Sequence, residues 1–133
     1  MLEIPIPGAE TLRLAHLVLD YNGTLACDGT LLPGVGAALQ RLAETLRVHV
    51  LTADTFGQAG DGLRGLDCDL TILSGGQQDV AKRQFVEGLG AAACACIGNG
   101  RNDRLMLATA ALGIAVVQAE GAAVETLMAA DVA

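Results

Sequence analysis

The chain has 133 residues, of which 52% are hydrophobic and only 2% aromatic, and its formal net charge is −7. This length suffices for one domain, residues 1–133, whose core is built mainly from Ala, Val, Leu and Ile. An acidic surface repels phosphate backbones and anionic lipid headgroups, so partnership with nucleic acid or with a membrane is disfavoured.

The first residues do not resemble a secretory leader. Pro5, Pro7 and several charged residues stand where a signal peptide needs an apolar core. The longest apolar stretch, residues 105–117, is too short to cross a bilayer. The four cysteines lack the C-x-x-C spacing of zinc sites. We therefore expect free thiols and a cytoplasmic protein.

Five short apolar runs predict buried strands, each bounded by polar residues or glycine. The runs are residues 14–19, 46–51, 70–73, 93–97 and 113–117. His16 and His49 lie within two of them and are expected to be packed imidazoles, because no Cys or His neighbours suggest a metal. Residues 2–6 alternate as an edge strand does, a place where prolines are tolerated.

Segments with helical periodicity lie between and after these strands. They are residues 33–46, 56–66, 77–89, 102–112 and 120–130. Pro33 fits the first turn of its helix, and Gly90 and Gly113 fit as C-terminal stops. The helix over 56–66 is the weakest because it contains four glycines.

The alternation of strand and helix predicts a parallel sheet with helices on both faces, joined by right-handed crossovers. In such folds ligands bind beyond the carboxyl ends of the strands. Asp20-Tyr21-Asn22-Gly23-Thr24 follows the first core strand, and Thr52-Ala53 follows the second. Lys82 lies on the helix before the fourth strand, which ends in Gly98-Asn99-Gly100-Arg101-Asn102-Asp103. The sequence thus predicts that these groups converge on one crevice.

The four motifs in this order resemble those of the haloacid dehalogenase-like (HAD) superfamily. The pattern is similar to the phosphorylation domain of P-type ATPases, and it is more similar still to the small soluble P-type ATPase-like members of the superfamily. The resemblance covers residues 16–131. It implies a Rossmann-like three-layer α/β/α sandwich with a mostly parallel sheet of about five strands. It also implies a minimal flap at Asp28-Gly29 and, given the short connections, no cap domain.

The resemblance further implies a Mg²⁺-dependent phosphatase or phosphotransferase. Asp20 matches the nucleophile that forms an aspartyl-phosphate, and Asn22, Thr52 and Lys82 complete the catalytic set. The residues matching metal-site positions are Asp20, Asn22 through its backbone carbonyl, Asn99 and Asp103. Those expected to contact a phosphorylated substrate are Thr24, Thr52, Ala53, Lys82 and Asn102. Asp54 and Arg101 lie near these motifs, but a loop carboxylate and a solvated cation are the commoner readings.

Two positions depart from the family pattern. Asn22 stands where phosphatases usually carry an acid-base Asp, and Asn99 where an Asp ligates the metal. An amide cannot exchange a proton and carries no charge, so slow hydrolysis is expected. The alternative is a catalytically degenerate protein that binds phosphate, metal or a protein partner. A receiver domain is disfavoured, because its phosphorylated Asp follows the third strand.

Without a cap, the site is expected to be open. This favours a macromolecular substrate, a homo-oligomer that covers the crevice, or a broad phosphate-ester activity.

Overall fold

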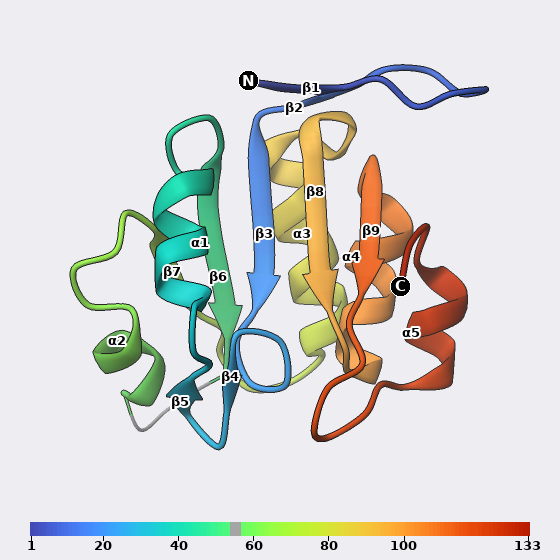
Figure 1. The fold of residues 1–133 in the computed structure, drawn as a ribbon. Coiled ribbons are helices and arrows are strands. Elements are labelled where there is room, and N and C mark those ends of the chain that lie inside the picture. The colour runs from blue at the N-terminus through green and yellow to red at the C-terminus, as the bar shows by residue number, and fades with distance from the viewer. Residues whose placement is uncertain (54–56) are drawn as a thin grey trace.

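Five parallel strands form the central sheet of the computed structural model, which describes residues 1–53 and 57–133 (Figure 1). In chain order they are β3 (His16–Asp20), β6 (Arg47–Thr52), β7 (Asp69–Ile72), β8 (Cys94–Gly98) and β9 (Leu112–Ala115). Their order across the sheet is β7-β6-β3-β8-β9, and all neighbours are parallel. The five predicted strands and the parallel sheet are confirmed, with ends shifted by one or two residues.

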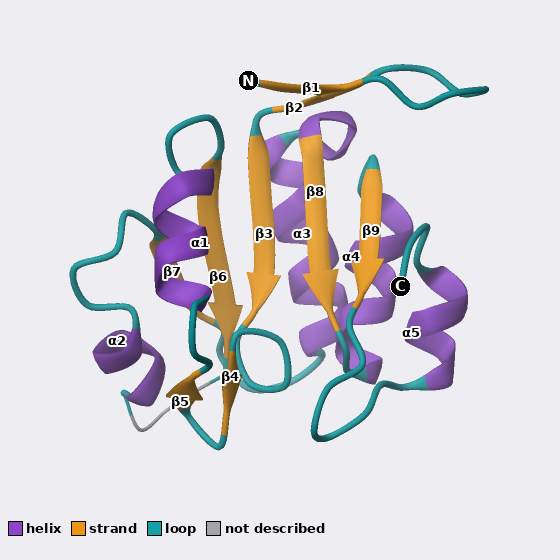
Figure 2. Ribbon diagram, viewed as in Figure 1, coloured by secondary structure: helices purple, strands orange, loops and turns teal. Residues whose placement is uncertain are grey.

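Helices cover both faces of this sheet, as predicted (Figure 2). They are α1 (Val35–Leu42), α2 (Gln58–Gly62), α3 (Gln78–Leu89), α4 (Arg104–Thr109) and α5 (Val124–Ala129). Alternation along β3 produces the two layers. Leu17 and Leu19 belong to the core that includes α1 and α2 side chains, whereas Val18 belongs to the core shared with α3 and α4.

The helices are shorter than predicted, and two of the expected end signals are wrong. Pro33 precedes the N-cap of α1, Gly34, which has a φ of 83°. The helix that was expected to stop at Gly113 already ends at Thr109, and Gly113 lies inside β9. A side chain at this glycine would collide with the backbone of Leu107 in α4. Close packing of strand on helix therefore explains Gly113.

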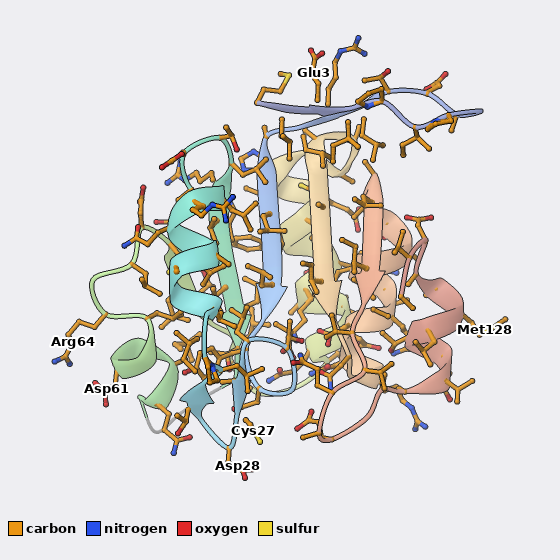
Figure 3. The ribbon with its side chains drawn as sticks, in the orientation of Figure 1. Glu3, Cys27, Asp28, Asp61, Arg64 and Met128 are labelled. Carbon is orange, nitrogen blue, oxygen red and sulfur yellow. The ribbon has the colours of Figure 1, made fainter. Side chains whose placement is uncertain are left out.

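Two hairpins complete the chain. β1 (Leu2–Ile4) pairs with β2 (Leu12–Leu14) in a separate antiparallel sheet, so the predicted edge strand does not join the central one. β4 (Ala26–Cys27) and β5 (Thr30–Leu31) form the expected flap. Figure 3 shows Cys27 and Asp28 at its tip. Among the described residues, the connection from β3 to β6 contains only this hairpin and α1, and that from β6 to β7 contains only α2. Neither connection, in its described part, contains a cap domain.

The remaining predictions concern thiols, imidazoles and membrane spans. All four cysteines are free, as expected. His16 Nδ1 and His49 Nε2 lie 3.1 Å apart, and the His49 ring contacts Phe85 edge-on. Both imidazoles are therefore packed within the protein. Over the described ranges, the structure has no helix that is long and apolar enough to cross a bilayer.

Candidate functional site

A pocket of about 420 Å³ lies beyond the carboxyl ends of the parallel strands, where this topology predicts a ligand site. Its lining residues are Asp20, Asn22, Thr52, Ala53, Gln58, Gln78, Lys82, Asn99, Gly100, Asn102 and Glu120. Seven of these were expected from the sequence. These seven residues come from the ends of β3 and β6, from the loops after β3, β6 and β8, and from helix α3, so segments distant in the sequence meet at this pocket.

Lys82 is the centre of a buried charge cluster. Its ammonium nitrogen lies 2.8 Å from Asp20 Oδ1 and 2.7 Å from Asp103 Oδ1. The Lys82 side chain is 1% exposed, that of Asp103 0%, and that of Asp20 14%. An ammonium group has three hydrogens to donate, and these two carboxylates occupy two of them. Among the described residues no other acceptor takes the third N–H, which therefore remains for a ligand in the pocket.

Asp103 occupies a different place from that expected of a metal ligand. It lies behind the pocket and is absent from its lining. Its Oδ1 accepts from Lys82, and its Oδ2 accepts the backbone N–H groups of Asn99 and Gly100 at 3.1 and 3.0 Å. Both oxygens are thus engaged, and Asp103 holds the Lys82 ammonium and the loop after β8 in place.

The cluster carries two carboxylates and one ammonium, and burial together with these charges controls its ionisation. Burial, together with the charge of Asp103, raises the pKa of Asp20 from 3.8 to about 6, although Lys82 acts in the opposite direction. Burial also disfavours the charged form of Lys82, but the two carboxylates outweigh it and raise the pKa of the ammonium. Lys82 therefore stays charged, whereas Asp20 titrates near neutrality.

We expect the metal-free protein to lose stability, relative to the Asp20→Asn variant, as the pH rises from about 4 to 7. Since the pKa of Asp20 is about 6 in the folded protein and 3.8 ordinarily, the folded state holds this proton more tightly. The stabilisation is complete below the lower value and lost above the higher one. At about 1.4 kcal/mol per pKa unit, the difference approaches about 3 kcal/mol.

Urea denaturation in EDTA at several pH values, on wild type and Asp20→Asn, measures this difference. Asp28→Asn, at the exposed tip of the flap, is the matched control and should follow wild type. Parallel pH profiles for wild type and Asp20→Asn would contradict the expectation.

A tight turn after β3 brings Asp20 to the pocket. The carbonyl of Tyr21 accepts the N–H groups of Thr24, Leu25 and Ala26. Gly23 has a φ of 82°, and a Cβ there would collide with the side chains of Asn99 and Glu120. Both the positive φ and the close approach of these two side chains therefore require glycine at position 23.

Asn22 and Thr24 flank this glycine but point to different partners. Asn22 is exposed, and its Oδ1 accepts the Gly29 N–H at 2.9 Å, which ties the turn to the flap. Thr24 is buried, and its hydroxyl donates a hydrogen bond to Asp20 Oδ2 at 3.4 Å. Because Thr24 does not line the pocket, its place differs from that expected of a substrate contact. It supports Asp20 instead.

Asn99, at the end of β8, is 3% exposed and yet lines the pocket. Its side-chain Nδ2 donates to Glu120 Oε1 at 2.8 Å and to the Gly121 carbonyl at 3.1 Å. Both partners belong to the loop after β9, so Asn99 joins the fourth and fifth strand ends.

The donors in the pocket suit a hard cation. Asp20 offers a carboxylate, Asn99 and Asn22 offer neutral oxygens, and Glu120 adds a second carboxylate to the wall. Oxygen-only donor sets of this kind fit Mg²⁺, which keeps several waters in proteins. Within the described ranges, no three His, Cys, Asp or Glu side chains gather as a metal cluster. At the pocket itself, Asn99 offers an amide in place of a carboxylate, and Asp103 is absent from the lining.

Sequence reasoning missed four lining residues: Gln58, Gln78, Gly100 and Glu120. Glu120 carried a usable signal, since it follows the fifth strand as the other site residues follow theirs. Arg101 is not in the lining and pairs with Glu125 at 3.4 Å, so the reading as a solvated cation is favoured. Asp54 lies outside the described residues.

Comparison with known proteins supports the fold at low sequence identity. No family model matches the chain. A 39-residue stretch, 29% of this chain, is 44% identical to 89% of the uncharacterized protein MJ0072 of Methanocaldococcus jannaschii.

Solved structures match far more of the chain. One, from Streptomyces avermitilis, is assigned to the HAD family of hydrolases and has a TM-score of 0.70 at 21% identity, over 90% of this chain and 75% of that one. The 3-deoxy-D-manno-octulosonate 8-phosphate phosphatase of Moraxella catarrhalis was solved with magnesium and phosphate. It has a TM-score of 0.72 at 17% sequence identity, over 91% of this chain and 76% of that one. The catalytic domain of the CPx-ATPase CopB-B has a TM-score of 0.62 at 22% sequence identity, over 77% of this chain and 40% of that one.

Proposed function

We propose that this chain, which has the fold of the haloacid dehalogenase-like hydrolases without a cap domain, is a Mg²⁺-dependent phosphatase or phosphotransferase that works through an aspartyl-phosphate on Asp20. The observation that carries the proposal is the placement of Asp20. Its carboxylate lines an open pocket together with Thr52 and is bonded to a buried ammonium, whose third N–H has no acceptor among the described residues. The phosphatases among the structural neighbours support the same reaction class.

The first step is attack of an Asp20 oxygen on phosphorus. The bond from phosphorus to the ester oxygen breaks, and the leaving oxygen takes a proton from water. Lys82 and the Thr52 hydroxyl stabilise the charge that builds on the transferring oxygens. Ala53, through its backbone N–H, and Asn102 are further contacts for the phosphoryl group.

The second step is attack of water, or of another acceptor, on the phosphorylated carboxylate. The bond from phosphorus to Asp20 breaks, which releases phosphate and restores the carboxylate. No side chain that can exchange a proton stands at position 22, so we propose that this step is slow.

A bound Mg²⁺ would offset repulsion between the two anions that must approach each other. Asp20, Asn99 and the backbone carbonyl of Asn22 are the groups proposed to hold it. Asp103 serves this site by orienting Lys82 and the loop that carries Asn99.

The substrate is a phosphate ester that enters an open pocket. A space of about 420 Å³ admits a phosphoryl group together with part of the group that carries it, and no cap encloses this space among the described elements. A macromolecular substrate, or a second copy of this chain over the opening, fits such a site. The four free thiols favour a reducing compartment such as the cytoplasm.

Labelling tests the proposed function directly. The protein is incubated with acetyl phosphate and Mg²⁺, quenched in acid, and mapped by peptide mass spectrometry. We expect a phosphoryl group on Asp20 in wild type and in the Asp28→Asn control, and none at this position in Asp20→Asn. Wild type without a label, and without phosphate-ester turnover that depends on Asp20, would favour the alternative of a phosphate- or metal-binding protein.

A further inference from the structure

We infer that Glu120 supplies the negative charge that Asn99 lacks, and that the two side chains form one matched unit for holding the cation. Glu120 also orients the Asn99 amide so that its carbonyl oxygen faces the pocket. The inference rests on the proposed function, because it concerns the metal of that same site.

The contacts of Asn99 fix the direction of its amide. Its Nδ2 lies 2.8 Å from Glu120 Oε1 and 3.1 Å from the Gly121 carbonyl oxygen. A carboxylate and a carbonyl can only accept hydrogen bonds, so they must face the NH₂ group. The amide oxygen then points away from them, and Asn99 presents to the pocket the atom that a cation binds.

The same contacts explain why an amide stands at position 99. An aspartate there would place a second carboxylate at hydrogen-bond distance from Glu120 and opposite the Gly121 carbonyl. Position 99 is buried whereas Glu120 is exposed, so water screens this contact only in part, and the contact between like charges is unfavourable. Asn99 with Glu120 carries one negative charge, as an aspartate beside a neutral residue would. The charge is retained at the pocket and moved to another side chain.

Glu120 is placed by its loop and left free to act on a cation. The Gln118 amide donates to the carbonyls of Gly23 and Thr24 at 3.2 and 2.8 Å, and the Ala123 N–H donates to the Asn99 carbonyl at 2.9 Å. The loop is therefore tied to the turns after β3 and β8. Over the described residues, no Lys or Arg forms an ion pair with Glu120.

Gly23 is the third part of this arrangement. The space that a Cβ at position 23 would need is filled by the Glu120 carboxylate and the Asn99 amide. Glycine at position 23, in the turn after β3, therefore leaves the space that the Asn99 and Glu120 side chains occupy.

A double-mutant cycle tests the inference, with Asn99→Asp, Glu120→Gln and both together. The first readout is urea unfolding in EDTA, which needs neither metal nor turnover. We expect Asn99→Asp to raise the unfolding equilibrium constant about tenfold in the wild-type background, and clearly less with Glu120→Gln. Glu120→Gln removes only part of the destabilisation, since the Gly121 carbonyl oxygen would still face the carboxylate at position 99.

The second readout is Mg²⁺ affinity, measured by calorimetry. We expect Glu120→Gln to weaken Mg²⁺ binding by about 10- to 100-fold, and Asn99→Asp added to it to recover most of the loss. Glu125→Gln is the matched control, because this exposed carboxylate pairs with Arg101 outside the pocket. It should bind Mg²⁺ as wild type does.

The outcomes separate this inference from the proposed function. Wild type that binds Mg²⁺ and is labelled on Asp20, with Glu120→Gln unchanged in affinity, overturns the inference alone. Wild type that neither binds Mg²⁺ nor is labelled overturns both. If Asn99→Asp raises the unfolding equilibrium constant equally in wild type and in Glu120→Gln, the inference that the two side chains form a matched pair is overturned.

Discussion

The Asn22→Asp variant is expected to break down the proposed aspartyl-phosphate on Asp20 about 10²–10⁴ times faster than wild type, the usual contribution of a positioned acid-base group. Asn22 lines the pocket beside Asp20 and is exposed to water. A carboxylate at this position could take a proton from the attacking water, which the amide cannot do. Its oxygen could still accept the Gly29 N–H that Asn22 Oδ1 now accepts at 2.9 Å, so the flap should keep its place.

Single-turnover decay of the labelled protein, sampled by acid quench, measures this rate. Asn22→Ala is the matched control, because it removes the bond to Gly29 without adding a carboxylate. Acceleration in both variants would point to a loosened flap, and an unchanged rate in Asn22→Asp would contradict the proposed role of position 22.

Replacing Lys82 by methionine is expected to destabilise the metal-free protein by about 3–5 kcal/mol at neutral pH, the usual loss when one partner of a buried ion pair is removed. Methionine keeps much of the aliphatic volume of lysine. It leaves Asp20 and Asp103 without their shared ammonium, and Asp103 is completely buried. The loss should shrink as the pH falls, because protonation of Asp20 removes the repulsion.

The adjacent Arg83→Met variant is the control for the loss of a cation from the same helix. The Arg83 side chain is 39% exposed and pairs with Glu87 across one turn at 3.3 Å. Exposed pairs of this kind contribute about 0.3–0.5 kcal/mol. Urea unfolding of both variants in EDTA makes the comparison, and losses of similar size would contradict the central place given to Lys82. Lys82→Met should also abolish labelling of Asp20.

Much of the fold could be predicted because local pattern and long-range packing agree in this chain. Each buried strand is an apolar run that ends in a polar group, and parallel strands bring those ends to one edge. Asp20 and Thr52 could be placed together on this ground alone. The β1–β2 hairpin was not foreseen, because alternation shows that a segment is extended but not which strand it pairs with.

Gly113 and Glu120 show where local pattern fails. A glycine after a helical run is typical of a helix end, but Gly113 is needed because β9 approaches Leu107 closely, a contact that no local signal reveals. The sequence pattern predicts a helix over 120–130 that includes Glu120, whereas α5 begins only at Val124. Because the predicted start of this helix is wrong, Glu120 was not recognised as a pocket residue. Asp103 differs again: its motif is evident, but its role depends on which oxygens are already engaged.

The β1–β2 hairpin and Met1 lie at the end of the sheet opposite the pocket (Figure 1). An affinity tag, a fluorophore or a surface linker attached at Met1 would therefore project away from Asp20. Immobilised protein prepared in this way should keep its opening accessible even to a bulky macromolecular phosphate donor. Attachment through Cys27, on the exposed flap, would instead crowd the entrance.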